Sequence, residues 1–118
     1  MNTENLATVE IARGADTSVQ LTYSDDFRKP VLLTGYSAFC TVKSPDLITT
    51  HDTLSTVNGR ITLTQSTGGI SLDFPSSVTA AYTFTSAVFD VLLVSPAGKH
   101  TYLPLMQITT YQPSTVPP

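Results

Sequence analysis

The sequence predicts an all-β protein, a single-domain antiparallel β-sandwich of immunoglobulin-like kind with about seven to eight short strands and an extended proline-rich tail. Apolar and polar residues alternate with a period of two over several short runs, and turn-forming residues separate these runs. No stretch of ten or more residues combines helical spacing with good helix formers. Because 118 residues fit one domain, we expect the sandwich over residues 1–110 and the tail over residues 111–118.

The first predicted strands each show one apolar face. In TVEIA, Val9 and Ile11 share a face, and in SVQLTYS the apolar residues alternate with Ser, Gln and Thr. In YSAFCTVK, Ala38, Cys40 and Val42 alternate with the residues between them. The segments ARGAD, DDFRKP, LTG and SPD are the turns between these strands, and GRITLT and GISLDF are two further strands separated by QSTGG.

The stretch VFDVLLVSPAGKHTYLPLMQI predicts a hairpin with its turn at SPAGK. Pro96 presets the first turn position, and Gly98 supplies a positive φ. Val91 and Leu93 face one way and Leu92 the other, so both faces of this strand are apolar. We therefore expect a central strand, buried on one side by the core and partly covered on the other.

Two short segments depart from the strand pattern. The segment PSSVTAAYTF predicts one helical turn that Ser76 or Ser77 caps. The tail YQPSTVPP has three prolines in eight residues, which favour an extended arm. The arm residues expected to contact a partner are Tyr111, Pro113, Val116 and Pro117.

Composition argues against several classes of partner. The net charge is -3, and no run of like charges exceeds Asp25 and Asp26, so we expect no nucleic-acid partner. No segment approaches the roughly 18 apolar residues that span a bilayer, so we expect no membrane partner. The single cysteine, Cys40, excludes an internal disulfide, and its pattern is typical of a core side chain.

The sequence predicts no catalytic, cofactor-binding or metal site. His51 and His100 stand beside turn residues, and no serine lies in a nucleophile-elbow pattern. His51 and Asp52 would point to opposite faces of a strand, so a surface loop is the better interpretation of that pair. Asp73 and Asp90 each lie within an apolar run and are expected on the outward faces of their strands.

The turn segments resemble those of small β-sandwich proteins of tailed bacteriophages. In those proteins a strand follows an RG-D turn, an LTGY segment leads into the next strand, and a YD-L-L-PAG hairpin precedes the last strand. The families include amino-terminal domains of baseplate upper proteins and short proteins that attach tail fibres. The resemblance covers roughly residues 10–110. Its matching residues are Arg13, Gly14, Asp16, Leu33, Thr34, Gly35, Tyr36, Phe89, Asp90, Leu92, Pro96 and Gly98.

The resemblance implies a structural virion protein and not an enzyme. Such proteins act as multicopy tail or baseplate adaptors that dock or anchor tail fibres. The implied partners are other virion proteins and copies of the chain itself, in a virion assembled from proteins made in the host bacterial cytoplasm. A capsid decoration protein, or a receptor- or carbohydrate-binding module, are the alternatives. This chain departs from the pattern at Pro104, which we expect at a sheet edge or bulge because proline removes a backbone donor.

Overall fold

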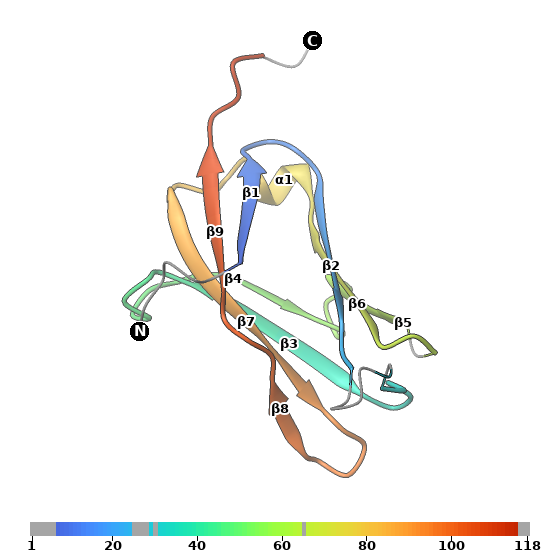
Figure 1. Cartoon of the computed structure of the whole chain (residues 1–118). Helices are drawn as coiled ribbons and strands as arrows, with labels where there is room; N and C mark the ends of the chain where they lie inside the picture. Colours follow the sequence, from blue (N-terminus) through green and yellow to red (C-terminus); the bar gives the residue numbers. More distant parts are fainter. Residues whose placement is uncertain (1–6, 25–28, 30, 65, 116–118) are drawn as a thin grey trace.

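The computed structural model describes residues 7–24, 29, 31–64 and 66–115. These residues form two β-sheets packed against each other, with one short helix at one end of the sandwich (Figure 1). The predicted fold class, an all-β sandwich, is confirmed. The predicted turn at Asp25 and Asp26 and the arm residues Val116 and Pro117 lie outside the described residues.

The elements follow the chain from the first strand to the arm. In order they are β1 (Thr8–Ala12), β2 (Thr17–Thr22), β3 (Ser37–Lys43), β4 (Thr50–Ser55), β5 (Ile61–Thr64), β6 (Gly69–Phe74), α1 (Ser76–Thr79), β7 (Ser86–Val94), β8 (His100–Tyr102) and β9 (Met106–Tyr111). Tyr111, expected in the arm, is therefore the last residue of β9, and the arm begins at Gln112.

The larger sheet has the order β1-β9-β7-β3-β4, with β8 also paired to β7. The smaller sheet has the order β2-β6-β5. Strands β3, β7 and β9 thus face β2, β6 and β5, as strands C, F and G face B, E and D in immunoglobulin-like sandwiches. One pair departs from the predicted antiparallel arrangement, because β1 lies parallel to β9. The chain crosses to the other sheet after β1, so β1 covers the edge of a strand that is distant in sequence.

The core lies between the inner faces of the two sheets. In β7 the residues Val91 and Leu93 are buried in the core, whereas Leu92 is half-buried on the outer face, as the two-faced pattern predicts. Cys40 is a core side chain as predicted. Its burial, with the charges of Asp90 and Asp52 nearby, raises the pKa of its thiol to about 12.

One strand was not expected from the sequence. Strand β4 (Thr50–Ser55) has the polar sequence THDTLS, and only Leu54 is buried in it. Period-two patterning cannot reveal such a strand, because one buried side chain defines no alternation. It forms by antiparallel pairing with β3, whose core-facing pattern is strong. Tertiary pairing, not local sequence, makes β4 a strand.

The predicted helical turn forms, but its predicted cap is wrong. Pro75 occupies the N-cap position of α1, and no side chain at that position caps the helix. Instead, Asp16 accepts a hydrogen bond from the backbone N–H of Ser76, with 2.6 Å between Oδ1 and N. A free helical N–H takes any well-placed acceptor, and here the acceptor comes from the β1–β2 turn.

Both proline and glycine predictions for the last hairpin are confirmed. Pro96 lies in the turn between β7 and β8, and Gly98 has a φ of +85°. Pro104 lies in the break between β8 and β9, where it is exposed. The chain therefore pairs with β7 twice, first as β8 and then as β9, with residues 103–105 between them.

Candidate functional site

The ARGAD turn between β1 and β2 binds the connection between β6 and β7. Arg13 Nη2 donates to the carbonyl oxygen of Phe84 at 3.2 Å, and the Gly14 N–H donates to Thr79 Oγ1 at 3.0 Å. Asp16, the third motif residue, accepts a hydrogen bond from the backbone N–H of Ser76 in α1, so every residue of the first predicted motif makes a contact with this connection. The motif thus holds one end of the sandwich together.

The second predicted motif lies at the opposite end of the sandwich. Thr34 and Gly35 form the turn before β3, in which the Tyr36 N–H donates to the Leu33 carbonyl at 3.0 Å. Gly35 has a φ of +76°, and a Cβ at this position would lie 2.7 Å from Cγ of Pro96. The turn before β3 therefore packs closely against the β7–β8 turn.

The predicted motif residues therefore do not form a single site. Asp90 lies on the outer face of β7, opposite Thr41, as expected. Asp73 lies on the outer face of the smaller sheet, where it accepts a hydrogen bond from Ser18 at 3.3 Å. The two carboxylates thus lie on different sheets and cannot act as a pair. Within residues 7–24, 29, 31–64 and 66–115, no cluster of His, Cys, Asp or Glu could hold a metal ion.

Three polar side chains form a cluster that links the two sheets, which we call the inter-sheet clamp: Asp52, Arg60 and Tyr82. Asp52 belongs to β4 of the larger sheet, and Arg60 immediately precedes β5 of the smaller one. Their contact is bidentate, with Nη2–Oδ2 and Nη1–Oδ1 distances of 2.7 and 3.0 Å. The Tyr82 hydroxyl donates to Asp52 Oδ2 at 2.6 Å.

The clamp keeps fixed protonation states near neutral pH. Burial disfavours the charged form of Asp52, but hydrogen bonds from Arg60 and Tyr82 outweigh it and lower the pKa of Asp52. Burial and the hydrogen bond to Asp52 raise the pKa of Tyr82. The carboxylate thus stays ionised and the phenol stays protonated, which suits a structural ion pair and not a proton-transfer group.

The prediction of a surface loop at His51 and Asp52 is wrong. Both residues belong to β4, and the register between β3 and β4 shifts at Val42 and Lys43. A bulge lets consecutive side chains reach the same side of a strand. Asp52 therefore enters the clamp while the His51 ring stacks on Phe84, with 4.4 Å between ring centroids.

An apolar row crosses the outer face of the larger sheet. Phe39 of β3, Leu92 of β7 and Tyr102 of β8 are direct cross-strand partners, so their side chains share this face. Phe39 is 40% and Tyr102 65% exposed. The charged residues that β3 and β7 place on this face are Lys43 and Asp90. This surface, the apolar row, is the strongest candidate for contact with another protein.

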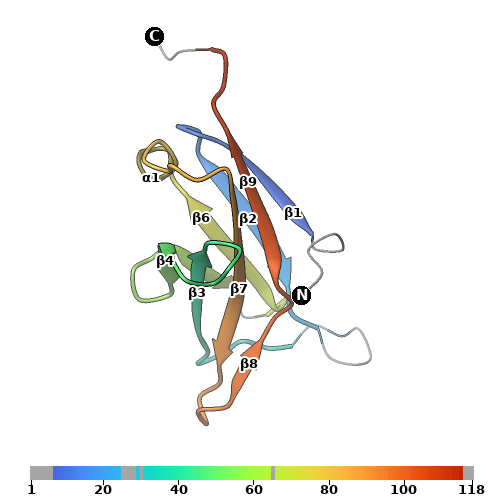
Figure 2. The ribbon, with the colours of Figure 1, turned by 90° about the vertical axis from the view of Figure 1, so that its left-hand side faces the viewer.

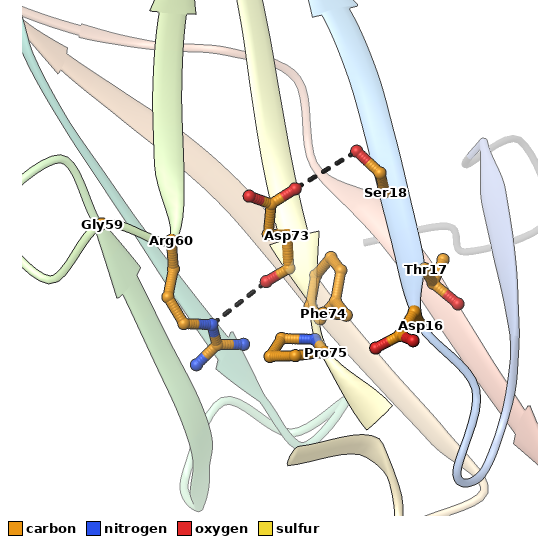
Figure 3. Close-up of a pocket in the computed structure, with 8 residues that line it drawn as sticks. All are labelled: Asp16, Thr17, Ser18, Gly59, Arg60, Asp73, Phe74 and Pro75. Atoms are coloured by element: carbon orange, nitrogen blue, oxygen red, sulfur yellow. Dashed lines mark hydrogen bonds between the residues drawn. The ribbon is translucent and has the colours of Figure 1, made fainter. Parts of the chain in front are cut away.

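The outer face of the smaller sheet is polar instead. Gln20 Nε2 donates to Ser71 Oγ at 2.8 Å and to Ser18 Oγ at 3.0 Å, which links β2 to β6 across this face. At its end lies a pocket of about 380 Å³. Figure 3 shows Ser18 and Asp73 reaching toward each other there, and Arg60 donating to the Asp73 carbonyl.

An apolar hollow of about 500 Å³ lies where the chain breaks between β8 and β9. Thr22, at the end of β2, and Ala7, just before β1, line this hollow. The other residues that line this hollow are all apolar: Leu21, Phe89, Val91, Leu103, Pro104, Leu105 and Met106. Pro104, which was expected at a sheet edge or bulge, lies in the break between β8 and β9 and lines this hollow, which the sequence did not predict.

Two comparisons with known proteins found no match. No protein-family model matches it, and no curated protein matches it. In the described part of the chain, no helix has the length and apolar character to cross a membrane.

Proposed function

We propose that this protein is a structural virion component of a tailed bacteriophage, a multicopy tail or baseplate adaptor that docks or anchors tail fibres, and that it has no enzymatic role. The apolar row Phe39, Leu92 and Tyr102 on the outer face of the larger sheet is the observation that carries the docking role. The resemblance of the turn segments to small tail proteins supplies the class of partner, another virion subunit.

The composition of the apolar row suits a protein partner. Interface centres are enriched in aromatic residues and depleted of charge. Phe39 and Tyr102 flank Leu92 on paired strands, so the surface is preformed and little conformational entropy is lost on docking. A partner surface of matching character, apolar and poor in charge, would cover this row.

A density map of phage particles that contain a tagged copy tests the proposal. We expect repeated copies at the tail or baseplate, each with its larger sheet against a fibre or tail subunit. Density on the capsid shell would favour a decoration protein instead, and a chain absent from purified particles would contradict the proposal.

A carbohydrate-binding module is the second candidate, and the pocket of Figure 3 favours it. Asp16, Asp73 and Ser18 line this pocket, and carboxylates and hydroxyls recognise sugar hydroxyls. Its aromatic residue, Phe74, is fully buried and offers no face for a sugar ring. A glycan array with the intact protein and with Asp73→Ala decides this question, since only a pocket-bound glycan depends on Asp73.

A further inference from the structure

We infer that the C-terminal arm, residues 112–118, of one copy docks in the apolar hollow of the next copy and links the copies head to tail. The inference rests on the proposed assembly role and names the partner of the arm, a second copy of the same chain. Three observations carry it: the course of the arm, the position of the hollow and the chemistry of both.

The arm leaves the sandwich instead of packing along it. Both views show the chain continuing past the end of β9 and beyond the β1–β2 turn (Figures 1 and 2). Gln112, Ser114 and Thr115 are exposed, and only Pro113 is half-buried, near the turn at Arg13. The described part of the arm therefore points away from its own apolar hollow.

The hollow lies at the other end of the strand that bears the arm. Met106, the first residue of β9, lines the hollow, and Tyr111, the last, leads into the arm. Six strand residues span about 20 Å. An arm of seven residues would have to reverse its direction and run fully extended to reach the hollow of its own chain, so the hollow of a neighbour is the better-placed receptor.

The arm and the hollow match in chemistry. The arm sequence QPSTVPP has no charged side chain, and the residues lining the hollow carry none either. Proline-rich segments hold an extended conformation before binding and dock in apolar grooves at low entropic cost. A volume of about 500 Å³ lies in the range of sites that enclose a small ligand or a few side chains.

The arrangement determines the type of contact between the copies. The donor surface, the arm, and the acceptor surface, the hollow, are different parts of the chain, so the contact is heterologous. Such contacts generate closed rings when the rotation between copies closes, and filaments when it does not. A closed ring of copies around a tail is the outcome that fits the proposed adaptor role.

Sedimentation velocity of the full-length chain tests the inference. We expect deletion of residues 112–118 to weaken self-association at least tenfold. Leu105→Asp, which puts a charge in the hollow, and Thr22→Trp, which fills it without a charge, should do the same. Circular dichroism identifies a variant that fails to fold, and Val57→Asp, at a site 85% exposed outside the hollow, is the matched control.

A mixing experiment distinguishes head-to-tail from symmetric association. The arm-deleted chain keeps the hollow, and Thr22→Trp keeps the arm, so their mixture should form one-to-one dimers and nothing larger. The peptide YQPSTVPP should bind the arm-deleted chain and fail to bind arm-deleted Thr22→Trp.

Several outcomes would overturn the inference. The inference fails if the chain still self-associates after deletion of residues 112–118. It also fails if the wild-type chain is monomeric and the peptide does not bind to the arm-deleted chain. Peptide binding only after removal of residues 1–6 would assign the hollow to the chain's own N-terminus. The proposed function fails separately, when the chain is absent from particles although arm-dependent association is intact.

Discussion

The two outer faces of the sandwich differ in how they meet solvent. The face of the smaller sheet satisfies its polar side chains internally, with Gln20 bonded to Ser18 and Ser71. The face of the larger sheet presents the exposed rings of Phe39 and Tyr102 instead, in register with Leu92 between them. Alternation along a strand therefore shows which side chains point outward, but not whether the outer face of the sheet is polar or apolar. One face engages its polar side chains with one another, and the other exposes aromatic side chains to solvent.

Loss of the inter-sheet clamp, which joins the two sheets, should have the strongest effect. Arg60→Ala leaves the carboxylate of Asp52 largely buried without its cation, and we expect a loss of about 3 kcal/mol in the free energy of unfolding. Urea denaturation measures this, with Lys99→Ala as an exposed control expected within about 0.5 kcal/mol. A change for Arg60→Ala no larger than that of the control would show that the clamp does not hold the sheets.

The same clamp predicts a pH dependence. The folded-state pKa of Asp52 is lowered relative to an unfolded value of about 3.9. Its contribution to stability is therefore present above about pH 4 and is lost as the pH falls through the folded-state pKa. Wild type and Asp52→Asn should accordingly converge in unfolding free energy below about pH 4, whereas a constant difference down to acid pH would contradict this assignment.

The next effect concerns the hairpin that carries Tyr102 on the apolar face. Gly35→Ala combines an unfavourable positive φ with a contact to Pro96, so we expect a loss of about 2 kcal/mol. Gly59 has nearly the same φ, +79°, but open space around it, so Gly59→Ala should cost about 1 kcal/mol. Thermal unfolding of both variants isolates the steric contribution, and equal losses would rule it out.

A charge on each outer face tests the comparison directly. Tyr102→Asp should reduce incorporation into particles at least tenfold, which corresponds to about 1.4 kcal/mol, because an interface centre does not tolerate an unpaired charge. Gln20→Asp on the polar face is the matched control and should leave incorporation unchanged. Quantitative mass spectrometry of purified particles measures both, and equal incorporation would remove the apolar row from the proposed interface.

The smallest effect sharpens the interpretation of the polar face. Its hydrogen bonds are exposed to water, so Gln20→Ala should change the free energy of unfolding by no more than about 0.5 kcal/mol. Chemical denaturation checks this value. A loss above 1 kcal/mol would mean that the network stabilises the sandwich and is not only a solvated surface.

Much of the fold could be predicted because the local patterns are strong. The alternation of Val91 and Leu93 on one face with Leu92 on the other identified β7 as a central strand. Gly98 marked the turn after β7, and Pro104 marked the interruption that separates β8 from β9. These predictions held because each depends on one residue type with a narrow conformational range or on simple alternation. The parallel pairing of β1, the strand β4 and the cap of α1 depend on residues distant in sequence, so no local pattern could reveal them.

The candidate surfaces divide in the same way. The strand faces, the turns and an uncharged, proline-rich tail could be read from the sequence, because side-chain direction in a strand and backbone restriction at Gly and Pro are local properties. The tertiary structure, through the register of β3, β7 and β8, places Phe39, Leu92 and Tyr102 in one row. It alone brought Asp52 to Arg60 across the sheets, since register and sheet packing join segments that local sequence keeps independent.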